Sequence, residues 1–258
     1  MIDIKSFNSF SDGRLVGTKF YHFDKLRSTM NQASSLANQG TVSGSVIIAE
    51  EQTFGRGRFD RQWISGPSKD ILCSIILRPD ITQLPFVNMA ITLAVAETVE
   101  QITNQNCLIK WPNDVLVSER KLCGVLIEVE IIQGVVKHAI IGIGLNVNTD
   151  ISLYPEISST ATSISREVGE FVDRTYVLKV LLDHIEKFYS RVVNGNTLRD
   201  EWVSRLALIN ETIEVIFAGD RVFGKFLGID VQGRLLVETE PGNVISVSAG
   251  EIINRKTE

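Results

Sequence analysis

Hydrophobic residues recur at helical spacing in three stretches of the chain. We expect helices over residues 28–38, 84–102 and 176–193. Ser28 or Thr29 serves as the N-cap of the first helix, and Gly40 follows its end. A fourth helix should follow Thr197, where "TLRD" resembles a capping box.

Short apolar runs, each typical of a buried strand, separate these helices. They occupy residues 45–50, 71–79, 107–111, 114–117, 121–130 and 135–147. Because short turns join the last four runs, we expect antiparallel meander pairing at least in part.

The pattern changes near Glu211, after which four short alternating runs are separated by Gly, Asp and Pro turns. Such a pattern is typical of a small all-β unit, most simply an SH3-like barrel. The sequence therefore predicts an α+β domain over 1–207, with a mixed, largely antiparallel sheet and flanking helices. An SH3-like β-barrel should follow over 208–258.

Composition narrows the class of protein. The chain has 258 residues, 44% of them hydrophobic, and Lys and Arg number 26 against 31 Asp and Glu, giving a net charge of -5. An acidic chain argues against broad nucleic-acid binding. The N-terminal stretch does not resemble a secretory signal, and no apolar run reaches the ~20 residues that span a bilayer, so we expect a cytoplasmic protein that does not bind membranes.

Cysteines and histidines lack the spacing of metal sites. The three cysteines each lie in an apolar run and should be reduced core thiols, while the three histidines are scattered. The chemistry must therefore come from other residues.

The stretch "GRGRFDRQW" (55–63) places three arginines within six positions. Guanidinium groups match phosphate and carboxylate oxygens, and two glycines allow the backbone to fold closely around an anion. A solvated basic loop and an anion clamp are both compatible with this composition. Its position between two apolar strands favours the clamp.

"KWPND" (110–114) combines a cation, an aromatic ring, a proline, an amide and a carboxylate. Pro112 should end the preceding strand and present Asn113 and Asp114 at a turn, where oxygen ligands suit Mg²⁺. An ordinary turn is the alternative. Lys121 follows at the start of a strand, where a solvated lysine would be the default.

"IIGIGLNVN" (140–148) alternates with period two. Gly142, Gly144, Asn146 and Asn148 share one face, and the opposite apolar face should pack in the core. Repeated glycines on one strand face allow a flat ligand to approach the sheet closely.

Together these segments resemble the biotin protein ligases. Five motifs of that family occur here in the same order. They are GRGRxxRxW at residues 55–63, S..LRP at 74–79, KWPND at 110–114, KLxGxL at 121–126 and GxGxN at 142–146. "STM" (28–30) and "ATSI" (161–164) also fit. The resemblance covers nearly the whole chain and implies the biotin/lipoate ligase catalytic fold, which is class II synthetase-like.

The resemblance implies a ligase that activates biotin with MgATP to biotinyl-5′-AMP and transfers it to a lysine of a biotin carboxyl carrier protein domain. Neither step needs an enzyme nucleophile, so orientation and electrostatic stabilisation should supply the catalysis. It also implies the site residues. The biotin-binding set is Ser28, Thr29, Met30, Gln52, Arg56, Gly57, Arg58, Lys121 and Gly124.

The nucleotide end follows from the same resemblance. The ATP or adenylate set is Arg58, Arg61, Trp63, Asn113 and Asn146. Lys110, Lys121 and Arg58 would stabilise charge at the reacting groups, with the division between the two lysines left open. Asp114 would contribute to Mg²⁺ binding.

Two departures from the family pattern touch the arginine loop. Asp60 stands where the family often has glycine, and "SGPSKD" (65–70) stands where it often has SPxG. The first predicted helix begins by residue 28, so we expect no operator-binding module. The sequence leaves the acceptor carboxylase and the oligomeric state, including a homodimer, open.

Two other functions remain alternatives. A lipoate–protein ligase shares the fold and the adenylation chemistry, but carries an RRxSGGG-type loop. A binding protein that only sequesters biotin would not need Lys110, Asn113, Asp114 and Lys121.

Overall fold

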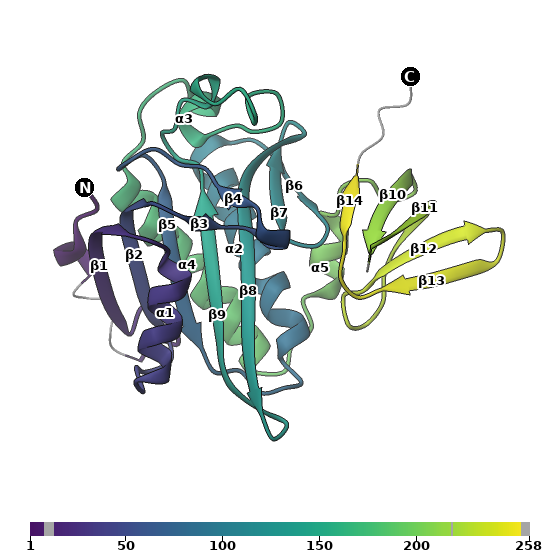
Figure 1. Ribbon diagram of the computed structural model, residues 1–258, viewed down its shortest axis with the longest axis horizontal. Helices are drawn as coiled ribbons and strands as arrows, with labels where there is room; N and C mark the ends of the chain where they lie inside the picture. The colour runs from purple at the N-terminus through teal and green to yellow at the C-terminus, as the bar shows by residue number, and fades with distance from the viewer. Residues whose placement is uncertain (8–12, 218, 254–258) are drawn as a thin grey trace.

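A seven-stranded sheet forms the centre of the molecule (Figure 1). The computed structural model describes residues 1–7, 13–217 and 219–253. In sheet order the strands are β1 (Lys19–Leu26), β2 (Ser45–Gln52), β5 (Ile71–Leu77), β9 (Val135–Leu145), β8 (Arg120–Ile132), β7 (Asp114–Val117) and β6 (Cys107–Lys110). Only the β1–β2 pair is parallel within this described sheet, so the prediction of a mixed, largely antiparallel sheet is confirmed.

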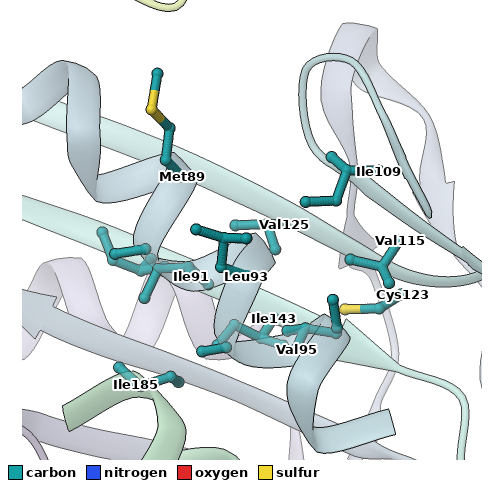
Figure 2. Packing of buried hydrophobic residues seen from close by; sticks show 14 of the residues in the cluster. Met89, Ile91, Leu93, Val95, Ile109, Val115, Cys123, Val125, Ile143 and Ile185 are labelled. Atoms are coloured by element: carbon teal, nitrogen blue, oxygen red, sulfur yellow. The ribbon is translucent and has the colours of Figure 1, made fainter. Parts of the chain in front are cut away.

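Helices cover both faces of this sheet. α1 (Thr29–Asn38) packs on β2, β5 and β9, while α2 (Leu84–Thr103) and α4 (Arg174–Val193) lie together on the opposite face (Figure 1). Figure 2 shows Leu93 and Val95 of α2 beside Val125 and Ile143 of the sheet, in the same buried cluster. The short elements are α3 (Ile164–Val168), α5 (Arg199–Ser204) and the 3-10 turns η1 (Ile4–Phe7), η2 (Arg58–Asp60) and η3 (Ile151–Leu153).

The alternation read from the sequence of β9 is confirmed. Ile141, Ile143 and Leu145 lie in the main core beneath α2 and α4. Ile140 packs instead with the residues under α1. The face that carries Gly142 and Gly144 is therefore turned toward α1, where the site lies.

A second sheet follows at the C-terminal end. Its antiparallel order is β13 (Asn243–Val247), β12 (Leu235–Glu240), β11 (Asp220–Ile229), β10 (Thr212–Phe217) and β14 (Glu251–Ile253). Four strands match the predicted runs, and β14 is an addition. The SH3-like closure and the boundary at residue 207 stay predictions.

Two local predictions were incomplete or wrong. β1 was missed because its burial is partial and charged residues interrupt its apolar pattern. The capping box at Thr197 is wrong: Leu198 is the N-cap of α5 and makes no side-chain capping bond. The Thr197 hydroxyl instead accepts a hydrogen bond from the Arg199 amide at 3.2 Å.

The three cysteines, Cys73, Cys107 and Cys123, are buried and unbridged, as predicted. Burial raises the pKa of the Cys73 and Cys107 thiols to about 12, so they stay protonated. In the described part of the chain, no helix is long and apolar enough to cross a bilayer.

A buried ion pair ties the N-terminal segment to α4. Glu50 accepts hydrogen bonds from Arg174 at 2.7 Å and from the Ile2 amide at 2.8 Å, and it lies 2.8 Å from His22. Burial alone would raise the pKa of Glu50, but the Ile2 bond and the bonds to Arg174 and His22 lower it to about 2.

Glu50 should make the chain acid-sensitive. The folded pKa of Glu50 lies below the ordinary value of 4.5. Its contribution to the free energy of unfolding is therefore complete above pH 4.5 and is lost as the pH falls toward 2. The shift corresponds to about 3 kcal/mol of unfolding free energy. Urea unfolding at pH 7 and pH 3 should show a drop that is smaller by about 2 kcal/mol in Glu50→Gln, because pH 3 still lies above the folded pKa and only part of the contribution is lost there. An equal drop in both proteins would contradict the assignment.

Candidate active site

One cavity of about 270 Å³ lies on the α1 side of the large sheet. Every site residue predicted from the sequence lines it, from Ser28 at the start of α1 to Asn146 after β9. Segments far apart in the sequence therefore converge on one space. The arginine hairpin, the KWPND turn and the glycine-bearing strands form three of its walls.

The arginine stretch is a tight hairpin. β3 (Gly55–Arg56) pairs antiparallel with β4 (Gln62–Trp63), and the Gly57 amide donates to the Arg61 carbonyl at 2.8 Å. Phe59 and Asp60 form the tip with φ of 54° and 58°. Both lie in the left-handed region that favours glycine, which gives a conformational reason for the family's glycine at the position of Asp60.

Each arginine of the hairpin is bound to another part of the molecule: Arg56 to β8 and α1, and Arg58 and Arg61 to the adjacent residues Gly250 and Glu251. Arg56 forms a two-pronged ion pair with Glu128 of β8 and donates to Asn31 of α1 at 3.2 Å. Arg61 pairs with both oxygens of Glu251 in β14, each at 2.6 Å. The basic stretch is therefore not simply solvated.

Arg58 lies deeper in the cavity wall. It donates to the Gly250 carbonyl at 2.9 Å and to Asn113 at 3.4 Å. Burial lowers the pKa of Arg58, although the charges of Asp114 and Glu251 raise it. The hydrogen bonds with Glu251 raise the pKa of Arg61. Both groups remain cations at neutral pH.

The sequence analysis missed the carboxylates Glu128 and Glu251. Glu128 could have been found, because alternation along β8 places it on the same strand face as Gly124 and Leu126. Glu251 gives no local signal, since its position depends on the pairing of β14 with β10.

The N-terminus of α1 forms a polar end of the cavity. The Ser28 hydroxyl caps the helix by accepting from the Met30 amide at 3.3 Å, which confirms Ser28 as the N-cap. The amide and hydroxyl of Thr29 donate to Gln52 at 2.7 and 3.1 Å, and Ser74 donates to the Thr29 hydroxyl at 2.8 Å. These bonds fix the donors and acceptors that face the cavity.

The opposite end of the cavity carries two lysines and a carboxylate. Lys110 and Asp114 come from the KWPND turn, and Lys121 comes from β8. Lys121 forms an ion pair with Asp114 at 2.8 Å. Burial lowers the pKa of Lys110, which has no ion-pair partner among the described residues, although the Asp114 and Glu251 charges raise it. Asn113 is held by a hydrogen bond to the Val125 carbonyl and by Arg58.

A segment after β9, which includes the ATSI stretch but received no role in the predicted site, closes another wall. The Lys121 amide donates to the Thr160 carbonyl at 2.8 Å, and the Thr162 amide donates to the Lys121 carbonyl at 2.9 Å. The predicted nucleotide residue Asn146 lines the cavity, but its amide group donates to Thr162 at 2.9 Å. Part of its hydrogen-bonding capacity therefore holds this wall.

The glycine-bearing face lines the cavity, and protein side chains also lie against it. The approach of a flat ligand to these glycines stays a prediction. A Cβ at Gly142 would lie 2.6 Å from the Met30 sulfur, and one at Gly144 would lie 2.5 Å from the Trp63 indole. A Cβ at Gly124 would also meet this indole, at 3.0 Å. The small residues accommodate Met30 and Trp63 directly.

Known proteins resemble the chain along most of its length. Residues 22–146 match the Biotin/lipoate A/B protein ligase family, and residues 208–255 match the Biotin protein ligase C terminal domain. The bifunctional ligase/repressor BirA of Bacillus subtilis is 36% identical over 233 residues, covering 88% of this chain and 72% of that protein.

A biotin–[acetyl-CoA-carboxylase] ligase of Mycobacterium tuberculosis is 31% identical, covering 84% of this chain and 82% of that protein. The structure of an Aquifex aeolicus biotin protein ligase in complex with biotin and ATP is similar with a TM-score of 0.78 and 29% identity. That likeness covers 91% of this chain and 97% of the other.

The chain therefore belongs to the biotin/lipoate A/B protein ligase family, among its biotin protein ligases. It is a ligase, and its fold is that of these enzymes.

The hairpin tip yields a stability prediction. Asp60→Gly should be more stable than Asp60→Ala by about 1 kcal/mol, because only glycine removes the Cβ that makes a positive φ unfavourable. Urea denaturation of the two variants measures the difference, and alanine controls for loss of the carboxylate. Equal stability would show that the tip does not keep this conformation.

Proposed function

We propose that the chain is an ATP-dependent ligase that activates biotin to biotinyl-5′-AMP and transfers it to a lysine of a biotin carboxyl carrier protein domain. The observation that carries this proposal is the convergence of three arginines and two lysines on one cavity with a separate polar end. Five cationic groups around so small a space suit a compact anion such as a nucleotide phosphate.

Biotin is assigned to the α1 end of the cavity. Thr29 and Gln52 are held there by mutual hydrogen bonds, so their remaining capacity is oriented toward the space beside them. Met30 offers an apolar surface next to these polar groups. A bicyclic ring with a polar ureido edge and an apolar remainder matches that combination.

ATP is assigned to the end formed by Arg58, Arg61 and the KWPND turn. Arg61 is bound to Glu251 at 2.6 Å, so phosphate oxygens would compete with a carboxylate for the same guanidinium group. Lys110 has no ion-pair partner among the described side chains. Phosphate oxygens can therefore bind its ammonium group without displacing a carboxylate.

The residues present fit Mg²⁺ only as an ion that arrives with the nucleotide. The described residues contain no cluster of three His, Cys, Asp or Glu, and Asp114 is the carboxylate at the lysine end. Mg²⁺ commonly binds through one or two carboxylates together with substrate phosphates. When bound, it would neutralise phosphate charge, and Asp114 would hold it after giving up part of its pairing with Lys121.

In the first step, a biotin carboxylate oxygen attacks the α-phosphorus of ATP. An O–P bond forms, the bond from the α-phosphorus to the bridging oxygen breaks, and pyrophosphate leaves. Lys110 and Lys121 stabilise the negative charge that gathers on the phosphoryl oxygens, and the arginine hairpin keeps the anhydride from water.

In the second step, the neutral ε-amine of an acceptor lysine attacks the acyl carbon. A C–N bond forms, the acyl carbon–oxygen bond to AMP breaks, and the amine loses its proton to solvent. The acceptor must therefore reach the hairpin side of the cavity.

Two expectations stay predictions: that the chain does not bind an operator, and that it is cytoplasmic. Whether it forms a homodimer stays open.

The test is isotope exchange between pyrophosphate and ATP. We expect exchange that depends on biotin and Mg²⁺. Lys110→Met should lower kcat/KM at least a hundredfold, because losing a charged group at the phosphate costs about 3 kcal/mol in such sites. Lys69→Met, which removes an exposed lysine that does not line the cavity, should stay within twofold.

Exchange that requires lipoate instead of biotin would favour a lipoate–protein ligase. Tight biotin binding without any exchange would favour a protein that only sequesters biotin. Asp114→Asn separates the two roles of that carboxylate: a higher Mg²⁺ requirement supports metal binding, and an unchanged requirement restricts Asp114 to pairing with Lys121.

A further inference from the structure

Gly124 and Gly144 lie directly opposite each other on the neighbouring strands β8 and β9. Both face the cavity, and the Trp63 indole covers both. Cβ atoms here would lie 3.0 Å from the ring at Gly124, and between 2.5 and 2.9 Å from three ring atoms at Gly144. The absence of two side chains at this pair of glycines thus leaves room for the indole against the sheet.

The indole nitrogen of Trp63 is a second, independent observation. Nε1 is buried and has no hydrogen-bond partner among the described residues. A buried N–H without a partner costs about 1–3 kcal/mol, so such donors are rare unless a ligand uses them. The ring also lies 5.6 Å from the Lys121 Nζ, measured to its centroid. The donor therefore belongs to the part of the cavity where Lys121 lies.

We propose that the Gly124–Gly144 pair is a seat for Trp63, and that the seated indole donates its N–H to an anionic oxygen of the bound substrate beside Lys121. The glycines then act as positioning residues through Trp63. This differs from a role in which the glycines admit the ligand itself to the sheet. The proposal deepens the proposed function, and only its kinetic part rests on that function.

The seat links the hairpin to the chemistry. Trp63 ends β4 and pairs with Gly55, where a Cβ would lie 2.7 Å from the Trp63 carbonyl. The backbone of the hairpin thus fixes one end of Trp63, and the glycine pair fixes the ring. A hairpin held this way keeps its indole N–H at one fixed place beside the cavity.

Fluorescence tests the seat without any ligand. Gly144→Ala should shift tryptophan emission to longer wavelength, because the new methyl group pushes the indole toward water. The same substitution in Trp63→Phe should cause no shift. Gly142→Ala is the matched control on the same strand, since its methyl group meets the Met30 sulfur instead. Absence of a shift in Gly144→Ala, or an equal shift in both backgrounds, would overturn the seat.

Exchange kinetics separate the two roles of the glycines. Gly144→Ala should lower kcat/KM for biotin-dependent pyrophosphate exchange more than twentyfold in the native background, but less than twofold in Trp63→Ala. Gly142→Ala should have the same effect in both backgrounds. If Gly144→Ala is equally damaging in both, the substrate itself lies on the glycines and the proposal fails.

Trp63→Phe tests the N–H alone, because it keeps an aromatic ring. Loss of a hydrogen bond to a charged group predicts a decrease of about ten- to a hundredfold in kcat/KM. A value within twofold of the native enzyme would overturn this part. Should Gly144→Ala not fold, Gly124→Ala offers the milder contact of 3.0 Å with the ring; it is read by fluorescence only, because its methyl group would also meet the Lys121 side chain at 3.2 Å. If the native chain shows no biotin-dependent exchange, the proposed function fails, whereas fluorescence still decides the seat.

Discussion

The pairing of the three hairpin arginines with groups from separate elements is the interaction on which the site depends. Three guanidinium groups within six residues repel one another, and a hairpin that carries them covers a buried sheet face more favourably if each group has an anionic or carbonyl oxygen as partner. Glu128 matches Arg56 from β8, and Glu251 matches Arg61 from β14. Arg58 is held by the Gly250 carbonyl. The hairpin is thereby fixed to both sheets.

This arrangement explains why an acidic chain can carry so cationic a loop. In the proposed reaction, substrate oxygens replace protein oxygens around guanidinium groups that are already oriented. Exchanging one anionic partner for another avoids the cost of leaving a cation partly buried and unpaired. It also makes the C-terminal sheet part of the cavity wall, since Gly250 and Glu251 hold Arg58 and Arg61, which the proposal assigns to the nucleotide. Lys110 completes the cationic end from the opposite wall.

The sequence predicted much of the site because its motifs are local. A turn such as KWPND keeps Lys110, Asn113 and Asp114 together whatever the rest of the chain does. Alternation along residues 140–148 was sufficient to assign the core face of β9, which the packing of Ile141 and Ile143 confirms. The parallel edge strand β1 was beyond this reasoning, because its partly exposed residues carry no clear period.

Contacts between residues far apart in the sequence could not be predicted, because no local pattern contains them. Glu251 reaches Arg61 across 190 positions, and the Trp63 indole fills a depression made by glycines of two other strands. Alternation placed these glycines on one strand face, but it could not show that Met30 and Trp63 from other elements lie against them. Asp60, which departs from the family pattern, lies at a positive φ that glycine adopts more easily.

The most direct test of the account is the intact mass of a biotin carboxyl carrier protein domain after incubation with the chain, biotin and MgATP. The account predicts a gain of one biotinyl group on a single lysine, and no gain when biotin or ATP is omitted. An acceptor domain of unchanged mass, together with measurable binding of biotin by the chain, would contradict it.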